Sequence, residues 1–300
     1  MSGRQSRDPD QTMPEDAHTT SQPLRNSKAV LITGCSSGIG LQAAKTLHNR
    51  GYQVFASARN ASDVERLSAL GLTALQLDLD NASSIENALE EVLQTTGGKL
   101  YGLFNNGGFG QAGAVEDLPT QALREQFETL VFGWHELTRR VIPVMRQQAE
   151  GRIIQNSSVL GFAAMPYRGA YNAAKFAIEG LSDTLRLELR SSNIKVSIIQ
   201  PGPIRTKFRA NGMTKFNQHI NATESVHAAP YTATLERLAA ASDASRFTLG
   251  PEIVVEKLIH ALESPKPRSR YRVTTPTIVF SVAKRLLPTA ALDKILGSIA

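Results

Sequence analysis

The stretch KAVLITGCSSGIG (residues 28–40) decides the fold, because it joins an apolar, strand-like run to a glycine-rich turn that opens a helix. The glycines Gly34, Gly38 and Gly40 have a GxxxGxG spacing, and the last two allow close approach of the backbone to a bound group. Such a turn offers backbone N–H groups and a helix N-terminus to a pyrophosphate. The stretch therefore predicts a dinucleotide-binding βα turn; the alternative is a plain βα turn.

Five further apolar, β-prone runs follow, separated by segments of helical length. The runs are YQVFASA (52–58), LTALQLD (72–78), LYGLFNN (100–106), GRIIQNSS (151–158) and IKVSIIQPG (194–202), and the helical segments include 39–50, 62–70, 82–95, 120–148 and 169–191. Near-continuous apolar strands indicate a parallel sheet buried on both faces. We therefore predict an α/β fold: a single Rossmann-type doubly wound parallel sheet flanked by helices on both faces, with ligand sites at the carboxyl ends of the strands.

The chain divides into three parts by composition. Residues 1–27 are polar, contain three prolines and predict a disordered N-terminal tail. Residues 28–275 form the expected catalytic domain, in which the polar stretch around 206–230 predicts a long substrate-loop insertion. Residues 276–300 form an apolar and basic C-terminal segment, which Pro288 interrupts, so one long helix is not expected there.

Charge and cysteine usage exclude several classes of protein. Of the net charge of +6, residues 264–300 carry +6 and residues 1–27 carry −1, so the middle is nearly balanced and nucleic-acid binding is not expected. A single Cys and no signal segment indicate a cytoplasmic protein. No apolar run is long enough for a membrane span. The scattered histidines predict no metal site.

Three chemically useful side chains lie in SSVLGFAAMPYRGAYNAAK (157–175). Tyr171 and Lys175 are four residues apart at the start of a helical pattern, so both project from one helix face. An ammonium beside a phenol favours the phenolate and lowers its pKa toward working pH, as a general acid/base requires. Ser158, at a strand end, could bond the same substrate oxygen. Alone, the pair would be an ordinary surface pair.

The motifs TGCSSGIG, FNNGG (104–108), Ser158, YNAAK (171–175) and PGPIRT (201–206) together resemble the classical short-chain dehydrogenases/reductases. Longer strings, FNNGGFG, IKVSIIQPGPIRTKF, SRFTLGPEIVVEK and KRLLP, are similar to those of bacterial NADP-dependent aldehyde reductases of that family. The resemblance implies that Tyr171 donates the proton in carbonyl reduction, that Lys175 lowers its pKa and holds the nicotinamide ribose, and that Ser158 orients the carbonyl.

The same resemblance implies a set of cofactor-binding residues. In FNNGG, Asn105 resembles the Asn of the family's NNAG, and Thr206 resembles the residue that bonds the nicotinamide carboxamide. The full set of residues expected to bind the cofactor is Gly34, Ser36, Ser37, Gly38, Ile39, Gly40, Arg59, Asp78, Leu79, Asn105, Tyr171, Lys175, Pro201, Gly202, Ile204 and Thr206.

The end of the second apolar run favours NADP(H) over NAD(H). An acidic residue there would bond a ribose 2′-hydroxyl, whereas this chain has Ala58 followed by Arg59. A guanidinium is always charged and can bind two phosphate oxygens. Asp78 resembles the family's adenine-contacting Asp, or alternatively caps the following helix.

Leu130 stands where many family members carry an Asn that helps to hold a water in the proton relay. Leucine can neither donate nor accept a hydrogen bond, so we expect reduced but real activity. The expected function is NADP(H)-dependent interconversion of an aldehyde or ketone with its alcohol. The alternatives are a steroid- or retinoid-like secondary alcohol dehydrogenase and a catalytically weak NADP-binding regulatory protein.

A lip of apolar side chains predicts a hydrophobic carbonyl substrate: Phe109, Phe162, Met165, Tyr167 and Phe208. The resemblance implies a homodimer or homotetramer assembled through the fourth and fifth helices. For residues 276–300, packing over the pocket or on a second subunit is favoured over contact with an anionic membrane surface.

Overall fold

A computed structural model describes residues 28–239 and 247–298, in which seven strands form one sheet of order β3-β2-β1-β4-β5-β6-β7. Every neighbouring pair is parallel. The predicted doubly wound α/β fold is confirmed. The strands are β1 Ala29–Ile32, β2 Gln53–Ala58, β3 Thr73–Gln76, β4 Gly102–Asn105, β5 Gly151–Asn156, β6 Ile194–Gln200 and β7 Arg270–Arg272.

The strand order reverses between β1 and β4. From β1 the chain builds outward to β2 and β3, then crosses back so that β4 pairs with the other edge of β1. In open parallel sheets, ligands bind in the crevice that such a reversal opens at the carboxyl ends of the strands. The glycine turn lies at this end, because it directly follows β1.

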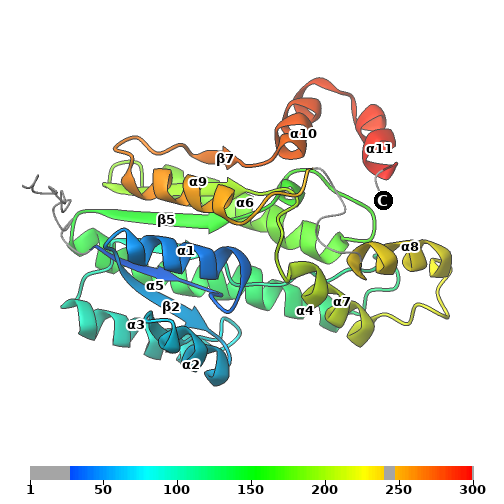
Figure 1. Ribbon diagram of the computed structural model, residues 1–300. Helices are drawn as coiled ribbons and strands as arrows, with labels where there is room; N and C mark the ends of the chain where they lie inside the picture. The colour runs from blue at the N-terminus through cyan, green and yellow to red at the C-terminus, as the bar shows by residue number, and fades with distance from the viewer. Residues whose placement is uncertain (1–27, 240–246, 299–300) are drawn as a thin grey trace, which may run out of the picture.

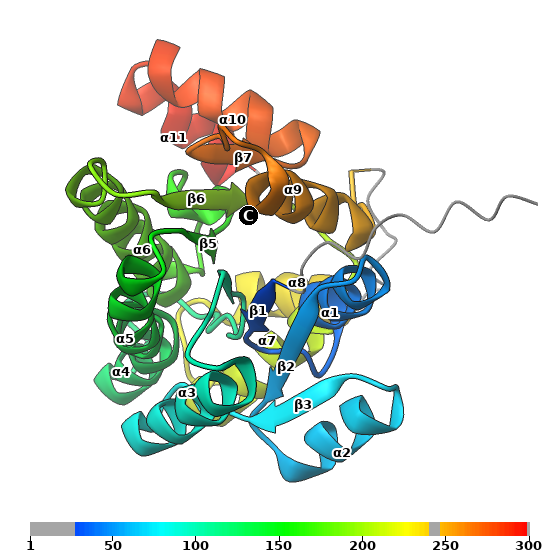
Figure 2. The ribbon, with the colours of Figure 1, turned by 90° about the vertical axis from the view of Figure 1, so that its left-hand side faces the viewer.

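Helices cover both faces of the sheet, as Figure 2 shows with the sheet between them. One apolar cluster joins the sheet to helices α1, α2 and α9, and a second joins it to α3, α5 and α6. Both faces of each central strand are thereby buried, which is why the strand sequences read as continuous apolar runs. The helices are α1 Gly38–Asn49, α2 Ala61–Ala69, α3 Ala82–Thr96, α5 Trp134–Gln147, α6 Gly169–Glu188 and α9 Glu252–Glu263.

The helix predicted over residues 120–148 is continuous but changes its winding. Helix α4 (Thr120–Phe127) passes into a π-helical turn, η1 (Glu128–Gly133), and then into α5. Gly133 lies against the backbone of Leu79, where an added Cβ would overlap the Leu79 carbonyl. A π turn inside a helix commonly occurs at a functional site. Leu130 lies within it.

The stretch around residues 206–230, predicted as a long loop, contains helix α7 (Phe208–His219), and α8 (Ala228–Ala239) begins at its end. The sequence shows no clear apolar stripe because only Gly212 and Phe216 of α7 are buried. Glu125 of α4 holds α7 instead, through an ion pair with Lys215 (2.9 Å) and a hydrogen bond with the His219 ring (3.2 Å). Tertiary contacts decide this helix, not local periodicity.

The C-terminal part adds elements that the sequence pattern does not indicate. Strand β7 escapes prediction because it is only three residues long and two of them are arginines, with Tyr271 its one buried side chain. Helices α10 (Thr275–Leu286) and α11 (Thr289–Gly297) follow, and Pro288 separates them as expected. Both lie at the outer edge of the molecule beyond β7 (Figure 1). The predicted disordered tail, residues 1–27, lies outside the described residues.

Candidate functional site

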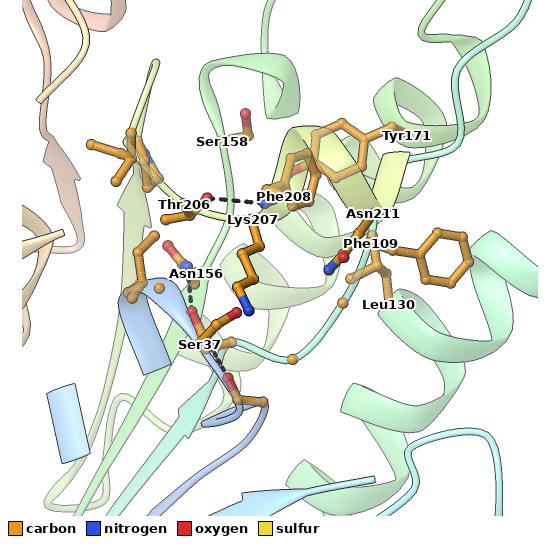
Figure 3. A pocket seen from close by; sticks show the side chains of 18 of the residues that line it. Ser37, Phe109, Leu130, Asn156, Ser158, Tyr171, Thr206, Lys207, Phe208 and Asn211 are labelled. Atoms are coloured by element: carbon orange, nitrogen blue, oxygen red, sulfur yellow. Dashed lines mark hydrogen bonds between the residues drawn. The ribbon is translucent and has the colours of Figure 1, made fainter. Parts of the chain in front are cut away.

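A cavity of about 1120 Å³ opens at the carboxyl ends of the strands. Its walls come from the glycine turn, the ends of β2 to β6, η1, α6, α7 and the first turns of α10. Figure 3 shows some of the side chains that line it, among them Ser158, Tyr171 and Leu130. Small-molecule pockets usually measure about 300–1,000 Å³, so this one has room for a large ligand.

Ser158, Tyr171 and Lys175 meet at one wall of this cavity. Tyr171 and Lys175 lie one turn apart on α6, and the Lys175 Nζ is 5.6 Å from the centre of the Tyr171 ring. Ser158 follows β5 as the cap of a short 3₁₀ helix, where its Oγ accepts a hydrogen bond from the Leu160 N–H (3.1 Å). The strand end and the helix thus bring together three residues spread over eighteen positions.

Burial is the main cause of the pKa shifts of Tyr171 and Lys175 at this wall. Burial raises the pKa of the Tyr171 phenol above its usual range, and the side-chain hydrogen bond with Ser158 lowers it by less. Burial also lowers the pKa of Lys175 to about 7, and the Glu179 carboxylate acts against that shift. The expected lowering of the Tyr171 pKa by Lys175 is not found: burial raises this pKa, and only the hydrogen bond with Ser158 opposes it.

Lys175 has two direct partners and a nearby carboxylate. Its Nζ donates to the Asn156 carbonyl oxygen (2.7 Å) and lies 4.2 Å from the centre of the Trp134 ring. Glu179, one turn further along α6, accepts hydrogen bonds from Gln200 (2.9 Å) and Arg270 (3.0 Å). These contacts hold the Lys175 ammonium group in one position at the cavity wall.

The glycine turn leaves no room for a side chain at Gly38 or Gly40. Gly38 has φ +57°, and a Cβ there would lie 2.8 Å from the Thr206 Cγ2. A Cβ on Gly40 would overlap the Gly34 carbonyl oxygen. Asn106 holds the turn from the side, because its Nδ2 donates to the carbonyl oxygens of Thr33 (3.0 Å) and Gly34 (3.3 Å).

Arg59 and Asp78 lie at the far end of the cavity, past the ends of β2 and β3. Arg66 of α2 joins them and is paired with Asp63 at 2.6 Å. Asp78 is not the cap of the following helix, because Asn81 accepts the capping hydrogen bond from the Ser84 N–H (3.1 Å). Asp78 instead lines the cavity.

Most residues predicted to bind a cofactor line this single cavity, and two do not. Gly40 packs inside the turn, and Asn105 is fully buried, with its Nδ2 donating to the Thr138 Oγ1 (2.9 Å). Asn105 therefore ties β4 to α5. The predicted residues that line the cavity are Gly34, Ser36, Ser37, Gly38, Ile39, Arg59, Asp78, Leu79, Ser158, Tyr171, Lys175, Pro201, Gly202, Ile204 and Thr206.

Asn106, Asn156 and Lys207 also line the cavity and were not predicted. Asn156 donates from its Nδ2 to the Asn106 Oδ1 (2.9 Å), which connects the lysine's partner to the glycine turn. Asn156 is the last residue of β5, and Asn106 directly follows β4. The rule that sites gather at the carboxyl ends of parallel strands would have found both.

Leu130 is buried and lines the cavity beside Gly108. A Cβ on Gly108 would overlap the Leu130 side chain, so the two fit closely. The place where the family pattern predicts an amide is thus filled by a packed hydrocarbon. Leu130 offers no polar atom to the cavity.

The predicted apolar lip is only partly present. Phe109, Met165 and Phe208 line the cavity, and the Phe208 ring covers Tyr171 with 5.4 Å between ring centres. Phe162 packs instead in a small cluster with Phe280, and Tyr167 packs against Tyr231. Helix α10 supplies further lining through Thr275, Pro276, Val279 and Phe280.

The residues present fit a dinucleotide. The cavity runs from Ser158, Tyr171 and Lys175, past the glycine turn, to the cation Arg59. At Gly38 in this turn, an added Cβ would collide with Thr206. Within the described part of the chain, the buried Asn156 Oδ1 and Ser157 Oγ have no hydrogen-bond partner, and both residues line the cavity. Such polar atoms are available to a ligand.

Other candidate chemistry finds no support among the described residues. Cys35 is buried, and burial raises its thiol pKa to about 12, which fits a packing role rather than a reactive one. Residues 28–239 and 247–298 contain no cluster of three or more His, Cys, Asp or Glu that could hold a metal ion. In the same residues, no helix has the length and apolar character needed to cross a membrane.

Comparison with known proteins finds one family throughout. The family model described as short chain dehydrogenase matches residues 28–216. The chain is 46% identical over 269 residues to the uncharacterized oxidoreductase YbbO of Escherichia coli (strain K12), covering 90% of this chain and 94% of that protein.

Two further relatives have named activities. An NADPH-dependent 3-dehydrocapnine reductase of Ornithobacterium rhinotracheale is 30% identical, with 88% of this chain and 94% of that protein covered. Retinol dehydrogenase 8 of Bos taurus is 32% identical, with 88% and 87% covered.

Solved structures share the fold. A short chain dehydrogenase/reductase from Burkholderia phymatum, in complex with NAD, superposes with a TM-score of 0.73 at 24% identity, covering 85% of this chain and 92% of that one. A short chain dehydrogenase from Burkholderia cenocepacia J2315, in complex with NADP, has a TM-score of 0.69 at 19% identity, with 90% and 97% covered.

Proposed function

Since the chain belongs to the short-chain dehydrogenase/reductase family, we propose that it is an NADP(H)-dependent oxidoreductase that interconverts an aldehyde or ketone with the corresponding alcohol. The observation that carries the proposal is the meeting of Ser158, Tyr171 and Lys175 at one wall of a cavity that continues past the glycine turn. Membership of the family makes the chain an NAD(P)-binding oxidoreductase; the nucleotide and the substrate class are our proposal.

The residues of this wall suit proton transfer to a carbonyl oxygen. A bound nicotinamide supplies hydride to the carbonyl carbon. Charge that develops on the oxygen is met by the Tyr171 hydroxyl, which gives up its proton, and by the Ser158 hydroxyl, which donates a hydrogen bond. Lys175 beside the phenol stabilises the phenolate that remains.

Arg59 supports NADP(H) as the nucleotide. Arg59 directly follows β2 and lines the end of the cavity where the adenosine would lie. Neither position 58 nor position 59 is acidic, because Ala58 precedes Arg59. A guanidinium attracts a ribose 2′-phosphate, whereas a 2′-hydroxyl is bound by a carboxylate. Titration with both dinucleotides tests this: NADPH should bind more tightly than NADH, and the reverse order would refute it.

The cavity supports an apolar carbonyl substrate. Phe109, Met165, Phe208 and Val279 surround the triad end with hydrocarbon. An aldehyde of medium or long chain length fits this lining, in line with the similarity to bacterial aldehyde reductases. Retinol dehydrogenase 8 among the relatives keeps a retinoid-like secondary or primary alcohol as the second candidate substrate.

A catalytically weak NADP-binding protein is the candidate from another class. The observation that favours it is Leu130, a buried hydrocarbon beside the proton donor where an amide would hold a water. We favour the enzyme, because the three residues that carry the chemistry are all present and share one cavity.

The test is a panel of aldehydes and ketones with NADPH, followed by the loss of nicotinamide absorbance. Wild type should turn over apolar aldehydes, and Tyr171→Phe should bind NADPH but lose about a hundredfold to ten-thousandfold in rate. Tyr167→Phe is the matched control, because Tyr167 lies outside the cavity lining. NADPH binding without turnover of any carbonyl would favour the regulatory candidate.

We also propose that the protein works in the cytoplasm as a homodimer or homotetramer. Exposed apolar side chains on η1 and α6 support this assembly, because Phe132, Leu181 and Leu187 are 54%, 48% and 60% exposed. These elements correspond to the helices through which the family resemblance predicts association.

A further inference from the structure

Helix α10 carries an apolar face that nothing in the described part of the chain covers. Ile278, Val282 and Leu286 are 50%, 51% and 75% exposed and recur every four residues. This spacing aligns them along one side of the helix. Leu287 and Ile295 continue the exposed apolar side chains into α11. We call Ile278, Val282, Leu286, Leu287 and Ile295 the C-terminal apolar surface.

The opposite side of α10 is held firmly against the protein. Thr277, Phe280 and Ser281 are buried. Lys284, on that same side, donates to the Phe162 carbonyl oxygen and lies 4.9 Å from the centre of the Phe176 ring. The exposed face is therefore fixed outward by packing, and α10 cannot turn it inward without losing these contacts.

Positive charge borders this surface. Arg285 and Lys294 are exposed and form no hydrogen bond or ion pair with a described residue. Residues 264–300 contain seven Lys and Arg against one acidic residue, Asp293. A helix with an apolar face flanked by cations is suited to lie in the interface of an anionic bilayer, with its apolar side chains among the acyl chains.

The charges disfavour a second copy of the chain as the occupant. In a two-fold symmetric dimer the same surface pairs with itself, so Arg285 and Lys294 of one copy would lie near those of the other. Like charges brought together at an interface are destabilising. Asp293 is the only acidic residue of the segment that could compensate. An anionic lipid surface supplies the opposite charge instead.

The cavity opens next to the same helix. Val279, between Ile278 and Val282 in sequence and 55% exposed, lines the cavity, as do Thr275 and Pro276 at the start of α10. A bilayer seated on α10 would therefore lie beside the cavity mouth. An apolar ligand could pass from lipid to the cavity without crossing bulk water.

We infer that α10 and α11 dock the protein peripherally on an anionic phospholipid bilayer, with the C-terminal apolar surface inserted among the lipids and Arg285 and Lys294 against their headgroups. The exposure of this face in the folded protein reverses the preference drawn from sequence, which favoured packing. Docking does not depend on the proposed oxidoreductase activity, because vesicle binding is measured without turnover.

Sedimentation with vesicles tests the inference. The full chain should pellet with vesicles that contain phosphatidylglycerol and remain in the supernatant with pure phosphatidylcholine. Added salt should release it, because the attraction to headgroups is screened. The pair Val282→Asp with Leu286→Asp should lower the partition coefficient at least about tenfold, and Arg285→Glu with Lys294→Glu should do the same.

Val226→Asp is the matched control, because Val226 is 84% exposed and lies outside α10 and α11. It should bind vesicles like wild type, and all variants should keep the wild-type melting temperature and rate on a short, water-soluble aldehyde. Three results would overturn the inference: no pelleting of wild type with anionic vesicles, equal pelleting of wild type and both surface variants, or a dimer in light scattering that Val282→Asp with Leu286→Asp converts to monomer.

Discussion

Lys175 combines deep burial with ionisation near neutral pH. Its pKa falls to about 7 because burial disfavours the ammonium, although Glu179 opposes the shift. Its hydrogen bond to the Asn156 carbonyl oxygen and its position over the Trp134 ring both favour the charged form. Small changes around this residue will therefore change its charge at working pH, and with it the stabilisation that a phenolate on Tyr171 receives.

Replacement of Lys175 by Met should stabilise the fold at low pH more than at high pH. The pKa of Lys175 in the folded protein (about 7) lies below the ordinary lysine value of 10.5, so between these values the unfolded chain binds more protons and wild-type stability rises with pH. The Met variant lacks this slope. The difference in free energy of unfolding between the Met variant and wild type, measured by urea unfolding, should shrink by roughly 4 kcal/mol between pH 6.5 and pH 10.

Lys45→Met is the control for this measurement, since Lys45 is an exposed lysine of α1. It should change stability little at either pH. An advantage of Lys175→Met that stays constant across the pH range would contradict the lowered pKa.

Leu130→Asn should raise turnover while it weakens the fold. The amide would offer hydrogen-bonding groups to the cavity wall beside Gly108, where leucine offers none. A buried amide without full partners costs about 1–3 kcal/mol. Steady-state rates with NADPH and a thermal melt measure both effects. Leu130→Met, which keeps an apolar side chain, is the control, and no gain in rate for Leu130→Asn would show that the position is not limiting.

At the scale of elements, the turn from β1 into α1 positions the proposed dinucleotide site. Its glycines serve two separate purposes: Gly38 needs a positive φ and an open side toward Thr206, whereas Gly40 permits close packing on Gly34. The same sheet end receives Asn106 from β4 and Asn156 from β5, which hydrogen-bond to each other (2.9 Å). The site is therefore a property of neighbouring strand ends.

Gly38→Ala should weaken dinucleotide binding at least about tenfold, because its methyl group would meet the Thr206 side chain at 2.8 Å in addition to the strain at φ +57°. Fluorescence titration with NADPH measures the loss. Gly51→Ala is a matched control: Gly51 also has a positive φ (+84°), but a Cβ there would meet nothing within 4 Å. Equal binding by both variants would show that the space beside Gly38 does not matter.

At the scale of the whole molecule, exposed apolar side chains gather in two places. One set lies on η1 and α6, with Phe132, Leu181 and Leu187, and the other is the C-terminal apolar surface. We assign the first to association between copies and the second to lipid. The assignments differ because Arg186 beside the first surface is paired with Asp183 (3.1 Å), whereas the exposed Arg285 and Lys294 beside the second are available to lipid headgroups.

Phe132→Asp with Leu181→Asp should convert the assembled protein to a monomer, because a buried carboxylate at a symmetric interface faces its own copy. Light scattering after gel filtration measures the mass. Val226→Asp again provides the control on an exposed apolar residue elsewhere. An unchanged mass would place the subunit interface on another face.

The sequence by itself determined the α/β alternation and the parallel sheet, and it predicted the chemistry that we propose for the site. These follow from local patterns: apolar runs of strand length, a glycine turn after the first of them, and Tyr171 and Lys175 one helical turn apart. Fifteen of the predicted site residues line one cavity, because the carboxyl ends of the strands meet in a doubly wound sheet.

Only the tertiary structure decided the features that depend on distant contacts. Helix α7 forms where the sequence shows no apolar stripe, because Glu125 of α4 holds it through Lys215 and His219. Burial, not the neighbouring ammonium, sets the direction of the Tyr171 pKa. The outward face of α10 exists because Phe280 and Lys284 fix the other side. Such contacts join residues far apart in the chain, so a local sequence pattern cannot predict them.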